Sequence, residues 1–168
     1  MSIYLGSNKI DTFGTSINTT TFYDNSIEDA FINRTISTYE NNNISFIGAY
    51  AFCSCSSLTT ANFPACTSIG SNAFYGCYSL TTASFPACTS IGSSAFTWCC
   101  NLLSVYLISV SSVPTLGNYA FSSTPIGDYT ASTGGVYGSI FVPSSLYTAF
   151  TLATNWNAIS ARIVAWQE

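Results

Sequence analysis

Charge is the scarcest feature of this 168-residue sequence. Only 6% of its residues are charged, with three Lys and Arg, seven Asp and Glu and no His, against roughly 25% in an average soluble protein. Three basic residues cannot neutralise a track of phosphates, so we expect no nucleic-acid partner. Without His, a Ser or Cys nucleophile lacks its usual base, which argues against an enzyme.

Long apolar runs are missing as well. No stretch approaches the roughly 18 consecutive apolar residues of a membrane-spanning helix, so we expect no membrane insertion. The first residues, MSIYLGSN, lack the basic and apolar regions of a signal peptide, so none is expected in this chain. The composition is nevertheless 48% hydrophobic and 15% aromatic, which is typical of a folded domain and not of a disordered chain.

The few charges avoid the middle of the chain. Residues 41–127 contain no Asp, Glu, Lys or Arg, so this part must stay soluble through Ser, Thr, Asn and Tyr. Any partner there meets neutral hydrogen-bonding groups and aromatic faces. A catalytic carboxylate pair is conceivable only among Asp24, Glu28, Asp29 and Glu40, and the neighbours Glu28 and Asp29 point apart on a helix.

A 13-residue sequence recurs almost unchanged inside the charge-free part. Residues 58–70, LTTANFPACTSIG, return at 80–92 as LTTASFPACTSIG, a shift of 22 residues. A fixed period of about 20–29 residues predicts a solenoid in which each coil covers the apolar face of its neighbour. We expect its core ladder to consist of Leu58, Phe63, Cys66, Ile69, Phe74, Leu80, Phe85, Cys88, Ile91, Phe96 and Leu102.

The two near-identical units follow the apolar spacing L-x-x-L-x-L-x-x-C, and the neighbouring units follow it with other residues, which predicts a leucine-rich-repeat solenoid. We expect a mostly β member of the α/β type: a parallel strand ladder with short helical turns, about four 22-residue coils and a cap at both ends. The whole chain, 1–168, forms a single domain. Residues 1–29 are an N-terminal cap or docking segment, 30–127 the repeats, and 128–168 a strand–helix–strand cap that protects the open end.

The segment 69–80, IGSNAFYGCYSL, and its copy at 91–102 resemble the BspA-type leucine-rich repeat of bacterial surface proteins. The resemblance covers residues 30–125. It implies a non-catalytic, adhesion-type module that binds a protein or glycan ligand and is secreted or lies on a bacterial cell surface. Similar repeats occur in proteins encoded by phages of gut bacteria. The alternative is therefore a structural or assembly component, such as a phage tail or virion-associated protein, that forms a homo-oligomer or joins a virion.

Outward strand positions form the candidate binding face. Alternation places these side chains in two rows, Thr38, Thr60, Thr82, Ser104 and Glu40, Asn62, Ser84, Tyr106. We interpret the rows as a flat, neutral binding face; hydroxyl rows that serve strand propensity and solubility are the alternative. Tyr75, Tyr78 and Trp98 lie where the repeat varies, as either a recognition strip or edge packing.

The cysteines also recur in register, at Cys66 and Cys88 and at Cys55, Cys77 and Cys99. Adjacent coils would bring such residues to about 5 Å, within reach of a disulfide. Ladder positions favour small apolar side chains, and a free Cys is one, so we expect buried thiols, with disulfides as the alternative. Because the chain has no His and no paired C-x-x-C spacing, we expect no metal and no other cofactor.

Overall fold

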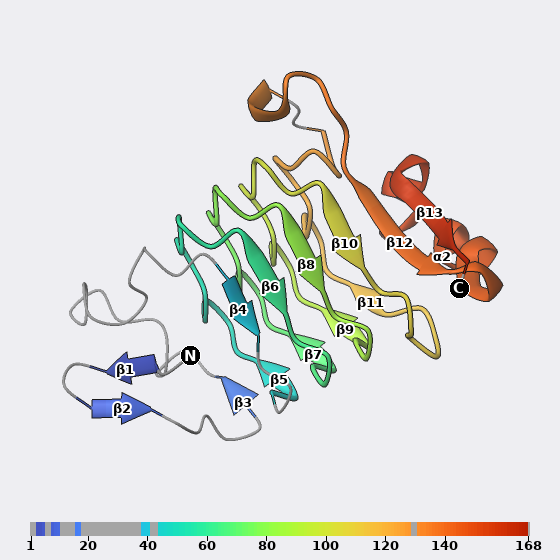
Figure 1. The fold of residues 1–168 in the computed structure, drawn as a ribbon. Coiled ribbons are helices and arrows are strands. Elements are labelled where there is room, and N and C mark those ends of the chain that lie inside the picture. Colours follow the sequence, from blue (N-terminus) through green and yellow to red (C-terminus); the bar gives the residue numbers. More distant parts are fainter. Residues whose placement is uncertain are drawn as a thin grey trace.

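Two parallel β-ladders run along the stacked coils of the chain (Figure 1). The computed structural model describes residues 44–128 and 131–167 and, before them, the backbone of four short strands. The larger sheet has the order β13-β12-β10-β8-β6-β4, and the smaller has the order β11-β9-β7-β5-β3. The coils therefore carry one rung in each sheet, and the second sheet is an element that the sequence pattern did not predict.

The strands of the larger sheet are β4 (Thr38–Glu40), β6 (Thr60–Asn62), β8 (Thr82–Ser84), β10 (Ser104–Tyr106), β12 (Ser139–Pro143) and β13 (Ile163–Trp166). Those of the smaller sheet are β3 (Ser16–Ile17), β5 (Phe46–Ile47), β7 (Ser68–Ile69), β9 (Ser90–Ile91) and β11 (Thr115–Leu116). An antiparallel pair, β1 (Ile3–Leu5) and β2 (Asn8–Ile10), precedes both sheets in the sequence. Apart from β1, β2 and β3, the segment 1–29 expected to form an N-terminal cap lies outside the described residues.

Alternating burial explains why each repeat forms its strand. In β6, β8 and β10 a buried central residue lies between two half-buried neighbours. The pairing places Ala61 opposite Ala83 and Ala83 opposite Val105, so the inward side chains stack from coil to coil. Because side chains alternate along a strand, the residues on either side of this row face outward.

The core consists of stacked aromatic and aliphatic side chains. Every residue of the predicted core ladder is buried, with at most 2% of its surface exposed. Phe52, Phe74, Phe96 and Phe121 form one column with ring centroids 5.0–5.3 Å apart and nearly parallel planes. Aromatic pairs at such distances add stabilisation beyond the burial of their area, so the column ties each coil to the next.

Residues with left-handed backbone angles shape the turns that follow each strand of the smaller sheet from β5 to β11. Hydrogen bonds from Ala73 N–H to Gly70 O and from Tyr75 N–H to Asn72 O close single turns. Positive φ angles between 55° and 70° recur twice per coil, at Tyr50, Asn72, Ser94 and Tyr119 and at Ser54, Gly76, Trp98 and Ser123. A left-handed residue ends a helix, so the helical turns expected for the coils stay one turn long.

The coils approach each other closely at the glycines that end the smaller strands. A Cβ atom on Gly92 would lie 2.5 Å from Ser71 N and 2.6 Å from Gly70 C. Gly92 N–H donates to Ile69 O of the preceding coil at 2.7 Å. Only glycine therefore lets adjacent coils meet at the spacing that this hydrogen bond requires.

A strand, a helix and a strand end the described part of the chain. After β12 come the 3-10 turn η2 (Ser144–Leu146), α2 (Tyr147–Leu152), the 3-10 segment η3 (Asn157–Arg162) and β13, while η1 (Ala131–Thr133) precedes them. β12 pairs with β10 and β13 with β12, both in parallel. The cap thus extends the larger sheet by two rungs and covers its last coil (Figure 1).

Candidate functional site

The outward side of the larger sheet positions the predicted binding residues in straight rows. Thr60 lies opposite Thr82, and Thr82 opposite Ser104. One row over, Asn62 lies opposite Ser84 and Ser84 opposite Tyr106. All six are half-buried, so the structure brings them together on one accessible face. Thr38 and Glu40 continue both rows in the backbone register of β4, but their side chains lie outside the description.

An aromatic cluster ends this face at the cap. Phe141 of β12 lies opposite Tyr106, and the two rings stack with centroids 4.9 Å apart. Trp166 of β13 meets both rings edge-on, at 6.1 Å from Tyr106 and 5.8 Å from Phe141. We call Tyr106, Phe141 and Trp166 the aromatic cluster. Tyr106 and Phe141 are half-buried, and Trp166 is exposed, so the cluster offers ring surface to a ligand.

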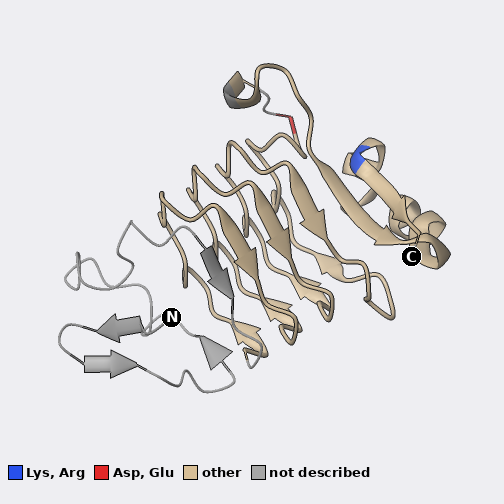
Figure 2. Cartoon of the chain, viewed as in Figure 1, with Lys and Arg blue, Asp and Glu red and all other residues tan. Residues whose placement is uncertain are grey.

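Five strands of this face, β6, β8, β10, β12 and β13, carry no charged side chain. Between residues 44 and 127 the sequence has no charged side chain. Among the described side chains the charged residues are Asp128, next to the last coil, and Arg162 of η3, coloured red and blue in Figure 2. The guanidinium of Arg162 lies over the ring of Tyr137, 3.5 Å from its centroid, and makes a cation–π interaction with it. The described part of the face therefore presents aromatic rings and neutral hydrogen-bonding groups.

The three aromatic residues of the predicted recognition strip lie elsewhere. Tyr75 and Tyr78 belong to the turns between β7 and β8, and Trp98 to the turns between β9 and β10. Tyr78 and Trp98 are exposed, whereas Tyr75 is half-buried. The carbonyl oxygen of Tyr78 accepts a hydrogen bond from Asn101 Nδ2 of the next coil at 2.7 Å, so its backbone helps to tie the coils together. Their role in recognition stays a prediction.

Two members of the aromatic cluster, Phe141 and Trp166, were not among the predicted site residues. Phe141 comes 35 residues after Tyr106 instead of 22, so a fixed period cannot align them. The available signal was the alternation in β12, where Ile140 and Val142 are buried and Phe141 is not. Alternation indicates which side of a strand a residue faces, but the pairing of β12 with β10 comes from the tertiary structure.

The ladder cysteines form part of the core and not of the face. All seven cysteines carry free thiols in the structure, and six of them are buried. Cys66 Sγ donates to Ser68 O and Cys88 Sγ to Ser90 O, each at 3.3 Å. Burial raises the pKa of Cys66 to about 11 and that of Cys88 to about 12, so these thiols hold their protons at neutral pH and are poor nucleophiles.

Within the described residues no group of three or more His, Cys, Asp or Glu side chains is placed to hold a metal ion. In the same part of the chain no helix is long and apolar enough to cross a membrane. The carboxylates considered as a catalytic pair, Asp24, Glu28, Asp29 and Glu40, lie outside the described side chains.

Comparison with known proteins agrees with this architecture. No curated protein matches the chain. A family model described as BspA type Leucine rich repeat region matches in six copies over residues 15–141. The match reaches beyond the predicted repeat region, 30–127, at both ends, and it has more copies than the four coils counted from near-exact repeats. Such repeats are generally non-catalytic protein-interaction modules and are often surface-associated. Because this family model matches most of the chain, the chain is a member of the BspA-type leucine-rich repeat family.

Proposed function

We propose that this chain is a non-catalytic, adhesion-type binding module that engages a protein partner through the outward face of its larger sheet. The observation that carries the proposal is the aromatic cluster at the end of a face whose described side chains carry no charge. Protein interfaces are depleted of charge at their centre and enriched in Tyr, Trp and Phe. The binding energy of an interface is concentrated in a few such residues.

Neutral glycans are the second ligand class, and the hydroxyl rows favour them. Thr82, Ser84 and Ser104 present hydroxyl groups on the strands that lead to the cluster. A sugar ring offers one apolar face and several hydroxyls, which suit an aromatic ring next to a polar row. Both classes fit a secreted or cell-surface protein of bacterial origin. A phage tail or virion-associated assembly protein is the alternative function.

Adhesion measurements on an immobilised panel of extracellular-matrix proteins and neutral oligosaccharides would test this proposal. We expect saturable binding to a protein of the panel. Trp166→Ala and Tyr106→Ala should each weaken that binding by a factor of about 30 or more, because an aromatic hot spot contributes about 2 kcal/mol or more. Surface plasmon resonance would give the dissociation constants.

Tyr147→Ala is the matched control, since Tyr147 is 39% exposed and Trp166 is 38% exposed, yet Tyr147 belongs to α2 and not to the sheet. Its dissociation constant should equal that of the wild type. Affinity that survives both Trp166→Ala and Tyr106→Ala would eliminate this face as the site. Binding only to oligosaccharides, with loss in the same variants, would replace the protein partner by a glycan.

A further inference from the structure

Backbone N–H groups in the turns of each coil donate to the following coil, and in the last coil these groups have only some of their acceptors among the described residues. Inside the solenoid, three N–H groups per coil donate to carbonyl oxygens of the next coil. Asn72, Phe74 and Gly76 donate to Ser93 O, Ala95 O and Thr97 O at 2.8–2.9 Å. One coil later, Ser94, Phe96 and Trp98 donate to Asn118 O, Ala120 O and Ser122 O at 2.8–3.2 Å.

The equivalent donors of the last coil are the N–H groups of Tyr119, Phe121 and Ser123. Asp128 takes over one carbonyl's place, because its Oδ1 accepts from Ser123 N–H at 3.1 Å. For the N–H groups of Tyr119 and Phe121, the described part of the chain provides no acceptor. Two backbone donors thus point along the solenoid axis from a coil that has no further coil after it.

On the other side of the same coil, the cap supplies donors that replace those of a further coil. Inside the solenoid, Ile91 O accepts from the backbone N–H of Gly117 in the next coil. At the equivalent position of the last coil, Leu116 O accepts instead from the Asn155 side chain, through Nδ2 at 2.6 Å. Pro114 O likewise accepts from Trp156 Nε1 at 2.7 Å. The cap therefore completes the smaller sheet, whereas no described residue of the cap accepts from Tyr119 N–H or Phe121 N–H in the turn ladder.

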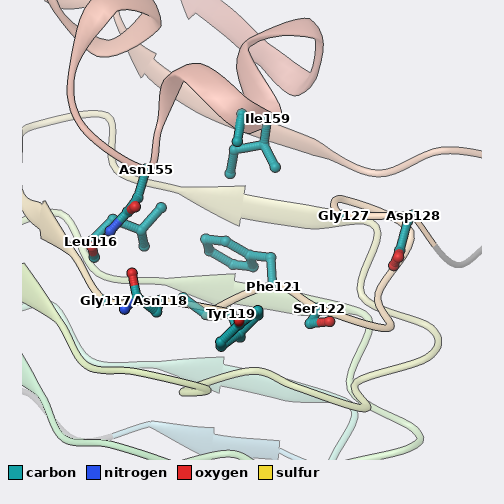
Figure 3. Close-up of a pocket in the computed structure, with 12 residues that line it drawn as sticks. Leu116, Gly117, Asn118, Tyr119, Phe121, Ser122, Gly127, Asp128, Asn155 and Ile159 are labelled. Carbon is teal, nitrogen blue, oxygen red and sulfur yellow. Dashed lines mark hydrogen bonds between the residues drawn. The ribbon is translucent and has the colours of Figure 1, made fainter.

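A hollow of about 510 Å³ lies over these open donors. Leu116, Asn118, Tyr119 and Phe121 of the last coil line one side of it, while Asn155 and Ile159 of the cap face them (Figure 3). Tyr119 is 76% exposed, whereas Phe121 is 3% exposed. Because a buried N–H group without an acceptor is costly, the hollow favours a ligand that brings an acceptor to the buried Phe121. The N–H group of the exposed Tyr119 offers the same ligand a second donor.

We propose that the hollow binds a turn of polypeptide from a partner protein, whose backbone carbonyl oxygens at positions i and i+2 accept from Tyr119 N–H and Phe121 N–H. The chemistry is that of the next coil: Ser93 and Ala95 present such a carbonyl pair to Asn72 and Phe74. The bound turn would extend the ladder by one rung, as in other complexes that reuse backbone pairing. This site is separate from the sheet face proposed above and does not depend on it.

Amide hydrogen exchange on the full chain tests the open donors directly. The N–H groups of Tyr119 and Phe121 should exchange at least tenfold faster than their equivalents in the preceding coil, Ser94 and Phe96. A peptide copied from residues 93–97, Ser-Ser-Ala-Phe-Thr with blocked ends, is the probe. It should shift the two amide resonances saturably and slow their exchange at least tenfold.

Filling the hollow provides the matched pair of variants. Ala158→Trp places a ring in the hollow that Ala158 lines, while Ala161→Trp changes an exposed residue of the same 3-10 segment outside it. Ala158→Trp should abolish the peptide-induced shifts, and Ala161→Trp should leave them unchanged. Slow exchange of both amides without peptide, or shifts that persist in Ala158→Trp, would overturn the proposal. So would self-association of the chain that Ala158→Trp abolishes, because a second copy would then be the occupant.

Discussion

The buried thiols of Cys66 and Cys88 show how a core position controls the chemistry of a side chain. Both are at most 1% exposed, and burial raises the pKa of Cys66 from 9.0 to about 11 and that of Cys88 from 9.0 to about 12. The folded chain therefore holds these protons more tightly than the unfolded chain. Their contribution to stability is complete below pH 9 and is lost as the pH rises through 11 and 12.

We expect the urea midpoint of the reduced protein to fall as the pH is raised from 9 to 11. The double variant Cys66→Ala/Cys88→Ala should start from a lower midpoint and fall less steeply, because it lacks the two protons that the folded state retains. All other residues are identical in the two proteins, so their contributions cancel in the comparison. Parallel pH profiles for the two proteins would contradict this explanation.

Within a coil, glycine has two different roles. Gly76 has a φ of 70°, and the same position one coil earlier is Ser54 with a φ of 61°. Gly92 has instead the backbone of Ser71 and Gly70 where a Cβ atom would lie. Conformational freedom explains Gly76, whereas close contact between coils explains Gly92.

Gly92→Ala should lower the free energy of unfolding by about 2–3 kcal/mol, in the upper part of the overpacking range, because neither backbone can yield without opening the stack. Gly76→Ser is the matched control. Its new Cβ atom would have no neighbour nearer than 3.6 Å, and a left-handed non-glycine residue costs about 1 kcal/mol. Equilibrium urea unfolding measures both, and equal losses would refute the distinction.

A solenoid is stabilised from coil to coil, so its ends decide how far the ladder extends. Trp156 is fully buried, packs edge-on against Phe150 at 4.9 Å and donates to Pro114 O. Trp156 therefore contributes to the packing of the cap and also donates one of the two side-chain hydrogen bonds by which the cap ends the smaller sheet. The cap protects a sheet edge that would otherwise be free to pair with another chain.

Trp156→Phe keeps an aromatic ring and removes the N–H donor, which leaves Pro114 O without its partner. We expect a loss of about 1–3 kcal/mol in unfolding free energy. Hydrogen exchange should accelerate more at Gly117 in the last coil than at Gly70. Trp98→Phe, at an exposed position, should change stability by less than about 0.5 kcal/mol. Uniform acceleration along the chain would show that the cap does not hold the last coil specifically.

Much of the repeat architecture could be predicted from the spacing of apolar residues. The 22-residue step brings Thr60 opposite Thr82 and Ala61 opposite Ala83, as the register of the sheet shows. The smaller sheet was missed because Ser68–Ile69 and Ser90–Ile91 are two-residue strands. Such strands are too short for alternation to distinguish them from a corner.

The sequence by itself determined the solenoid, its core ladder and its uncharged middle, because a repeated sequence places the same side chains at the same point of every coil. Only the tertiary structure decided that Phe141 and Trp166 join Tyr106, since β12 and β13 pair across intervals unrelated to the repeat. It also decided which donors of the last coil stay open. A ladder of hydrogen bonds is completed by the groups that lie next to it in space, and the repeat carries no information about the segment beyond its last copy.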